Sequence, residues 1–170
     1  MTNIFLASCH ALIDQEIVNA VCDYFINDKF NLNRNDLFFF STLGIQLGDD
    51  LCKHYIDVNH FPRQLLRPLV LGEPRVMSEC DYAIVFNTHL DEDGGHSNGV
   101  QNSLPKLVTN IKKKVVEVHL NMNSISVYDC ENKHTYEDTS QTMFFYERTD
   151  EGVKVESVIE RKRRMININR

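Results

Sequence analysis

Apolar side chains run almost unbroken through Asp81-Tyr82-Ala83-Ile84-Val85-Phe86-Asn87, a pattern typical of a strand covered on both faces of a sheet. A polar loop, Thr88–Asn98, follows, and apolar residues then recur at helical spacing as far as Ile111. Lys114–Leu120 is a second apolar strand pattern. Pro105 lies inside the helical segment, so we expect this helix to begin late, with Pro105 in its first turn, or to be kinked. Together these segments predict a strand–helix–strand unit with parallel strands.

The chain before this unit shows the same alternation. Asn3–Ala7 and Leu37–Phe40 are short apolar runs that suit buried strands, and each is followed by apolar residues at helical spacing. Asp14 precedes the first helical segment and is predicted to cap its N-terminus. Prolines between Phe61 and Pro74 break up any long helix and leave room for one short strand. We therefore expect an α/β fold with a Rossmann-like, mostly parallel sheet and helices on both faces.

From residue 121 onward the pattern changes, and three segments alternate apolar and polar residues. They are Ser124–Asp129, Thr142–Arg148 and Gly152–Glu160, and Asp150-Glu151-Gly152 is a good hairpin turn. We expect a C-terminal antiparallel β extension that continues the sheet or packs beside it. The predicted organisation is a nucleotide-binding-type domain over residues 1–120, a β-rich extension of the same domain over 121–160, and a basic tail over 161–170.

Composition limits the partners of the chain. It has 170 residues and a net charge of −6, so the molecule as a whole is a poor binder of polyanions. Its apolar runs fall short of the roughly 18–20 residues that a membrane span requires, so we expect no membrane partner. The N-terminal residues lack the basic start and long apolar stretch of a signal peptide, and we expect a cytoplasmic protein. The asparagine-rich, tryptophan-free composition suits a phage or AT-rich genome.

Cysteine and histidine patterns indicate neither a metal nor a redox centre. The five cysteines are scattered and form no CxxC pair, so we interpret them as reduced thiols, several of them on apolar faces. The seven histidines form no HExxH or HxH motif. We expect no metal and no other cofactor.

Ligands of parallel α/β sheets bind beyond the carboxyl ends of the strands, near the point where the strand order reverses. This rule selects the loops Ser8–His10, Ser41–Gly48, Gly72–Arg75 and Asn87–Asn102. The most informative stretch is Asp91–Asn102, because glycines between a strand and a helix let the backbone approach a ligand. The candidate ligand-binding residues are Ser8, Ser41, Thr42, Gly44, Gly48, Asp49, Arg75, Asn87, Gly94, Gly95, His96, Ser97, Asn98 and Asn102.

Each of these features also has a structural interpretation. The glycines of the last loop suit an exposed turn, and Asp49 or Asp50 suits a helix cap as well as a ribose contact. Arg75 is placed to meet a phosphate but also to pair with Glu73 or Glu79 on the surface. No lysine follows Gly48, so the loop before it is not a phosphate-binding P-loop.

Three motifs carry a resemblance to a known family. They are Gly44-Ile45-Gln46-Leu47-Gly48-Asp49-Asp50, then Gly72-Glu73-Pro74-Arg75-Val76 ahead of the strand from Cys80 to Phe86, and Gly94-Gly95-His96-Ser97-Asn98. Over residues 3–120 the chain resembles the SLOG superfamily of Rossmann-like proteins, which includes DprA-type and LOG-type domains and small stand-alone members.

The chain departs from that family's pattern at several positions. Val76 replaces the asparagine expected after Arg75, and Ser97 or Asn98 replaces the loop threonine. The glutamate that nucleoside-cleaving relatives carry on the following helix has no clear counterpart, since Gln101 and Asn102 occupy that region. The resemblance therefore implies nucleotide-type binding more than catalysis.

Three functional hypotheses follow. The first is a binding module for a nucleotide or nucleotide-derived small molecule, acting as sensor, sequestering protein or regulator. The second is an enzyme that cleaves an N-glycosidic or phosphate bond, with Asp91, Asp93, Asp49 or Asp50 as the carboxylate that enters the pocket. The third is an interaction module that meets a protein or nucleic acid through the β extension and the basic tail. The chain is also compatible with a homo-oligomer.

Overall fold

The computed structural model describes the chain except for residues 10, 44–46, 68–73, 89–97, 132–140 and 169–170, and it leaves the side chains of 74 and 98–103 undescribed. The strands are β1 (Thr2–Ser8), β2 (Leu37–Thr42), β3 (Arg63–Leu66), β4 (Tyr82–Asn87), β5 (Lys114–His119), β6 (Ser124–Asp129), β7 (Gln141–Thr149) and β8 (Gly152–Ser157). The α-helices are α1 (Gln15–Asp23), α2 (Leu47–Val58), α3 (Pro74–Met77), α4 (Asn98–Asn110) and α5 (Val158–Ile168), with a π-helical turn over Tyr24–Lys29 and a 3-10 turn over Arg34–Asp36.

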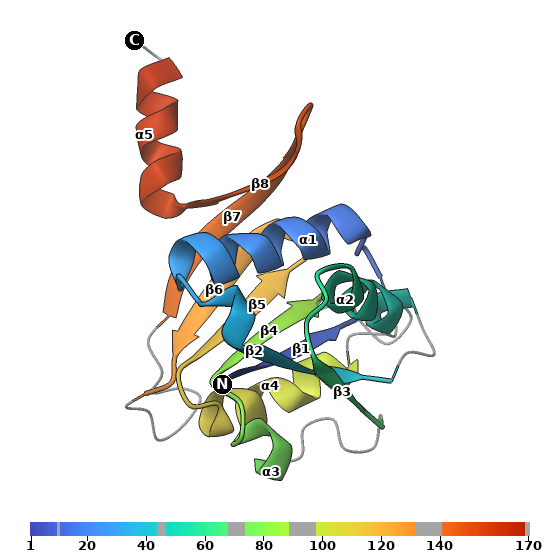
Figure 1. Cartoon of the computed structure of the whole chain (residues 1–170). Coiled ribbons are helices and arrows are strands. Elements are labelled where there is room, and N and C mark those ends of the chain that lie inside the picture. Colours follow the sequence, from blue (N-terminus) through green and yellow to red (C-terminus); the bar gives the residue numbers. More distant parts are fainter. Residues whose placement is uncertain (10, 44–46, 68–73, 89–97, 132–140, 169–170) are drawn as a thin grey trace.

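All eight strands form one sheet in the order β3-β2-β1-β4-β5-β6-β7-β8 (Figure 1). The pairs from β3 to β5 are parallel, and those from β5 to β8 are antiparallel. This architecture confirms the predicted α/β fold, with a Rossmann-like parallel half and a C-terminal antiparallel extension that continues the same sheet.

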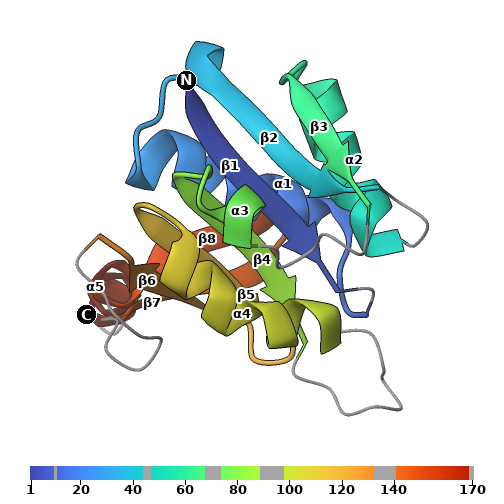
Figure 2. The same ribbon diagram turned by 90° about the horizontal axis from the view of Figure 1, so that it is seen from below.

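Helices cover both faces of the sheet. In Figure 1, α1 and α2 lie in front of the strands, and Figure 2 shows α3 and α4 against the opposite face. The larger core cluster lies on the α1 and α2 side and includes Ile4, Phe39 and Val18, while the smaller one lies under α3 and α4 and includes Val85 and Leu107. Asp14 caps α1 as predicted, because its side chain accepts a hydrogen bond from the Ile17 N–H at 3.0 Å.

The antiparallel extension shares the core of the parallel half. Phe144 of β7 is 1% exposed, and its ring lies edge-on to that of Phe25 at 5.2 Å between centroids. Arg148, near the end of β7, forms ion pairs with Asp14 and Glu16 at the start of α1. The hairpin is therefore attached to the domain through buried aromatic contacts and through surface charges.

Two expected boundaries differ in the structure. α4 begins at Asn98, so Pro105 lies within the helix and not in its first turn. Of the two alternatives, the late start was wrong, and the kinked helix stays a prediction. The strand expected over Gly152–Glu160 ends at Ser157, where α5 begins. The Glu160 N–H donates to Ser157 Oγ at 3.1 Å and the Ser157 N–H donates to Glu160 Oε2 at 3.3 Å, which is a reciprocal capping box.

Candidate functional site

The strand order reverses at β1. The chain passes from β1 to β2 and β3 on one side and later returns to β4 on the other, so the crossovers diverge between the carboxyl ends of β1 and β4. These two ends lie side by side, since Ser8 is in register with Phe86 and the Cys9 N–H donates to the Phe86 carbonyl at 2.9 Å. In an open α/β sheet this is where a ligand crevice forms.

Buried polar side chains occupy these two strand ends. Ser8 is 5% exposed, and Asn87 and Thr88 are fully buried. Ser8 Oγ donates to the Cys9 carbonyl at 2.7 Å, and the Thr88 side chain is hydrogen-bonded with the Cys9 thiol. Burial raises the pKa of that thiol and keeps it protonated at neutral pH, so Cys9 is not an activated nucleophile.

A carboxylate from the first turn of α2 joins this edge. Asp49 is 8% exposed, and burial, followed by repulsion from Asp50, raises its pKa to about 6. Asp49 lies near the end of β1, because the Cys52 thiol on α2 interacts electrostatically with both Asp49 and Cys9. The first turn of α2 therefore lies beside the carboxyl end of β1.

A second group of polar side chains lies on the α4 face of β4, β5 and β6, centred on Glu117. This glutamate is 1% exposed, and its carboxylate accepts hydrogen bonds from Asn87 Nδ2 at 3.1 Å and from the Tyr128 hydroxyl at 2.9 Å. A buried carboxylate needs such donors, because an unpaired one costs several kcal/mol. Asn87 thus connects the end of β4 to a buried carboxylate on β5.

His119 extends the same group toward the end of β5. Its Nε2 lies 2.8 Å from Ser126 Oγ and 3.7 Å from Glu117 Oε1. The Ser126 hydroxyl donates to Met143 Sδ at 3.3 Å, so its oxygen can accept a hydrogen bond from His119 Nε2.

The described part of the edge offers hydrogen-bond acceptors and neutral donors. Asp49 and Glu117 supply carboxylates, and Ser8, Asn87 and Thr88 supply hydroxyl and amide groups. Such groups suit the hydroxyls of a ribose and the polar edge of a base. None of these five side chains is cationic, so they are better suited to the nucleoside part of a ligand than to its phosphate.

The structure places five of the predicted residues at this edge of the sheet. Ser8, Thr42, Gly48, Asp49 and Asn87 are buried at the carboxyl ends of β1, β2 and β4 or at the start of α2. Ser41 is also buried, but its hydroxyl donates to the Leu6 carbonyl at 3.0 Å within the sheet.

Arg75 is exposed on α3, ahead of the amino end of β4, and within the described residues it makes no hydrogen bond or ion pair with Ser8, Asp49 or Asn87. Several predictions lie outside the described residues: Gly44, Gly94, Gly95, His96, Ser97, Asp91 and Asp93. For Asn98 and Asn102, on α4, only the backbone is described.

Glu117, His119 and Tyr128 were missed by the reasoning from sequence. A signal for Glu117 and His119 does exist in the sequence. The predicted strand Lys114–Leu120 carries a glutamate and a histidine that alternate with valines. A strand buried on both faces rarely carries an ionisable residue at its centre without a partner or a function. Tyr128 could not have been assigned in this way, because its pairing with Val115 depends on the register of β6.

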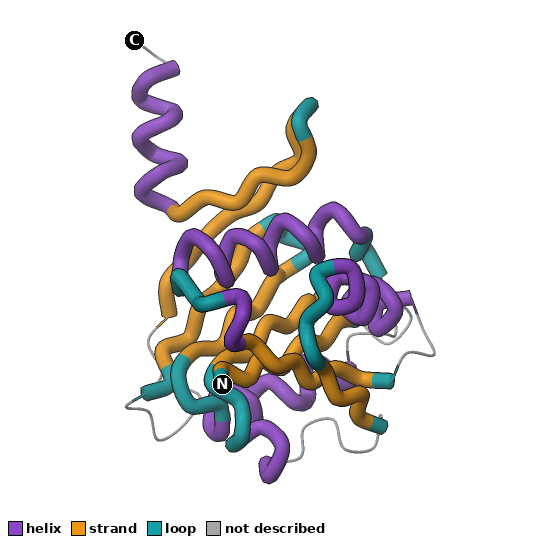
Figure 3. Tube along the Cα trace, in the orientation of Figure 1, coloured by secondary structure: helices purple, strands orange, loops and turns teal. Residues whose placement is uncertain are grey.

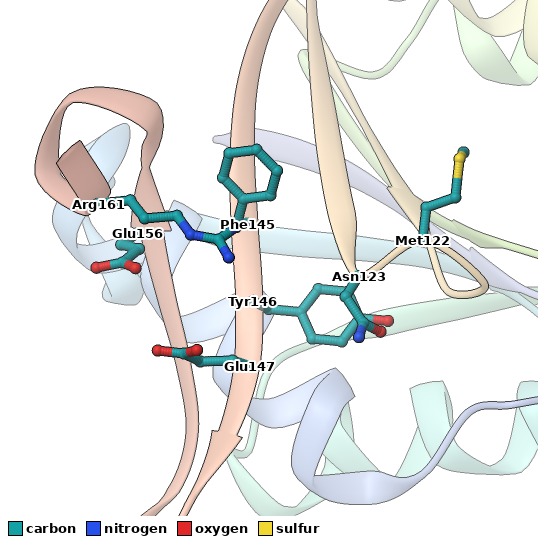
Figure 4. Close-up of a pocket in the computed structure, with 7 residues that line it drawn as sticks. All are labelled: Met122, Asn123, Phe145, Tyr146, Glu147, Glu156 and Arg161. Atoms are coloured by element: carbon teal, nitrogen blue, oxygen red, sulfur yellow. The ribbon is translucent and has the colours of Figure 1, made fainter. Parts of the chain in front are cut away.

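A separate cavity of about 270 Å³ lies where the β7–β8 hairpin meets α5 (Figure 4). Its lining residues are Met122, Asn123, Phe145, Tyr146, Glu147, Glu156 and Arg161.

All five cysteines are buried and free of disulfides. Among the described residues, no helix is long and apolar enough to cross a membrane. The same residues contain no group of three or more His, Cys, Asp or Glu side chains that could hold a metal ion.

Comparisons of the chain with protein-family models, curated proteins and solved structures found no match. The candidate site therefore rests on the fold and on the side chains that meet at its carboxyl edge.

Proposed function

We propose that this protein binds a nucleotide or nucleotide-derived small molecule at the carboxyl edge between β1 and β4. The observation that carries the proposal is the convergence of Ser8, Asn87, Thr88 and Asp49 on the point where the strand order reverses. Buried polar groups are costly unless they are paired, and sites for small polar molecules are built from a few such groups in an apolar setting.

Asp49 supplies the specificity in this proposal. A carboxylate at the start of a helix that follows a parallel strand accepts hydrogen bonds from vicinal ribose hydroxyls. Because the pKa of Asp49 is raised to about 6, the carboxylate is ionised at neutral pH and is a strong acceptor in a partly dehydrated position. The resemblance to the SLOG superfamily supports the same ligand class.

A thermal-shift screen with mononucleotides, cyclic nucleotides and ADP-ribose tests the proposal. A ligand at about 100 times its dissociation constant stabilises by roughly 2.7 kcal/mol, which raises Tm by about 5–10 °C for a chain of this size. Asp49→Asn should reduce the shift, whereas Asp50→Asn, the matched change at the exposed neighbouring residue, should leave it unchanged. Absence of stabilisation by every compound at millimolar concentration would contradict the proposal.

A second candidate function is cleavage of an N-glycosidic bond, and Glu117 favours it. The sequence offered no carboxylate on the helix after the glycine loop, but Glu117 places one on β5, two residues from the end of the strand and in contact with Asn87. Such a carboxylate can stabilise the developing positive charge on a ribosyl carbon. Chromatography of nucleosides and nucleotides incubated with the protein would detect the free base, and Glu117→Gln should abolish its release. Release at the wild-type rate by that variant would exclude this role.

A further inference from the structure

β8 forms one edge of the eight-stranded sheet. Within the described residues it pairs only with β7, so the opposite side of Gly152–Ser157 presents a row of backbone donors and acceptors. In Figures 1 and 3, α5 and the tip of the β7–β8 hairpin both project beyond the body of the molecule on the same side, at the two ends of this strand. An extended strand flanked in this way is a surface for strand addition.

The sequence of β8 is self-complementary in one antiparallel register. If two copies pair about Val155, Val155 meets the partner's Val155, and Lys154 meets the partner's Glu156, twice by symmetry. Directly opposed residues of an antiparallel pair point to the same face, so each lysine and glutamate lie side by side. Opposite charges at such positions attract, and like charges repel.

Neighbouring registers lack this match. A shift of the symmetry axis to Lys154 opposes two lysines, and a shift to Glu156 opposes two glutamates. A shift by half a residue opposes Lys154 to the partner's Val155 and loses both charge pairs. The register of a strand pair is strongly specified where both its charged and its apolar residues need suitable residues opposite them. The pairing centred on Val155 is therefore the favoured one.

The side chains of the hairpin are arranged for this pairing. Glu147 lies opposite Lys154 within the hairpin, so the row across the two molecules alternates in charge from Glu147 through Lys154 to the partner's Glu156. Arg164 of α5 holds the Glu156 carboxylate, with Nη2–Oε1 at 2.8 Å and Nε–Oε2 at 3.3 Å. Glu156 is 4% exposed in the single chain, and each oxygen of its carboxylate can accept a second hydrogen bond, from a lysine that arrives along the strand edge.

The two projecting elements also fit one another across such a pair. In the register centred on Val155, Val158 lies opposite the partner's Gly152, so the start of α5 comes beside the acidic turn that contains the partner's Asp150 and Glu151. α5 carries four cationic side chains and one acidic one, and none of its eleven residues is buried. Ile159 is 63% exposed. A helix of this length is marginal without tertiary packing. In the single chain α5 contacts its own hairpin through Arg161 over the Phe145 ring and through Arg164, and a partner's hairpin would add to this packing.

We propose that a second copy of this chain docks on β8, so that the two sheets join through an antiparallel β8–β8 pair with Lys154 opposite the partner's Glu156. The inference is independent of the ligand proposed for the carboxyl edge. It commits to a homodimer because the complementary charges belong to the same strand. A polyanion would find cations on α5 but would be repelled by Glu147 and Glu156, which already take up Arg164 of that helix.

Sedimentation of the full chain over a concentration series tests the dimer. The wild type should sediment as a species of twice the 19.7 kDa chain mass. Lys154→Glu should raise the dimer dissociation constant roughly 30-fold, or about 2 kcal/mol, because two attractive pairs become repulsive. Glu156→Lys should weaken it similarly, and the double variant should recover much of the loss. Lys106→Glu, the same charge change at an exposed position on α4, is the matched control and should have no effect.

The outcomes separate the alternatives. Recovery in the double variant supports the β8 pair even if one single variant folds poorly, which circular dichroism would show. A monomeric wild type at the highest concentration would overturn the proposal. So would a dimer that Lys154→Glu does not weaken, or a monomer that assembles only on single-stranded DNA, which would assign α5 to a polyanion.

Discussion

Tyr128→Phe tests whether the buried carboxylate of Glu117 is held by the hydrogen bonds that the structure shows. The substitution removes one hydroxyl and keeps the ring, so it removes the 2.9 Å bond to Glu117 Oε1 without deleting the aromatic packing. Glu117 is 1% exposed and Tyr128 is 6% exposed, so water has little access to replace the lost donor. The change should therefore lower stability through the loss of this hydrogen bond.

A hydrogen bond to a charged group contributes about 1.5–3 kcal/mol, and a buried acceptor left short of a donor lies toward the upper part of that range. We expect the free energy of unfolding to fall by about 2 kcal/mol. For a chain of this length that corresponds to a decrease in Tm of roughly 4–8 °C.

Urea unfolding at pH 7 followed by circular dichroism measures this loss, and a double-mutant cycle with Glu117→Gln isolates the interaction. Residues in direct contact give non-additive effects, so we expect a coupling energy of about 1 kcal/mol or more. Tyr82→Phe is the matched control, because Tyr82 is 8% exposed and its hydroxyl makes no hydrogen bond within the described residues. Its effect should stay within about 0.5 kcal/mol. Equal losses for the two tyrosine variants, or additivity in the cycle, would refute the reasoning.

Three further predictions concern other parts of the chain. Because the pKa of Asp49 is raised to about 6 from an ordinary value of 3.8, the folded state holds this proton more tightly than the unfolded state, and stability is lost as pH rises through that interval. The free energy of unfolding of Asp49→Asn should therefore match that of the wild type below pH 4 and exceed it by about 1–2 kcal/mol at pH 8. Equal stability of the two proteins at both pH values in urea titrations would contradict the burial of this group. Phe144→Ala should cost about 3–5 kcal/mol and preserve a single calorimetric transition, whereas two separate transitions would show that the hairpin is not part of the common core. Ser157→Ala should destabilise α5 by about 1 kcal/mol, seen as faster amide exchange in that helix, and unchanged exchange would exclude the capping box.

The parallel half of the fold could be predicted because its signals are local. Buried strands such as Leu37–Phe40 and Asp81–Asn87 are short apolar runs, and the helices between them show apolar residues at helical spacing. The α5 helix was also within reach, since Ser157 and Glu160 have the spacing of a capping box. The residues before Ser157 alternate between apolar and polar, and those after Glu160 are mostly basic. The sequence reasoning therefore assigned this segment to a strand and a tail and not to a helix.

Long-range relations could be predicted only in part. Position at strand ends selected Ser8, Asp49 and Asn87, because the carboxyl edge of a parallel sheet follows from the order of elements. The contact between Asn87 and Glu117 depends on the register of β4 with β5, and that of Tyr128 depends on the register across an antiparallel turn. Periodicity identifies which face a residue occupies but not which residue stands opposite it.

The most direct test of the proposed site is an amide chemical-shift titration of the isotope-labelled protein with AMP and with ADP-ribose. We expect the largest shifts at Ser8 and Cys9, at Asn87 and Thr88, and in the first turn of α2, all at the carboxyl ends of β1 and β4 or beside them. Shifts confined to β8 and α5, or none with either compound at millimolar concentration, would contradict nucleotide binding at this edge.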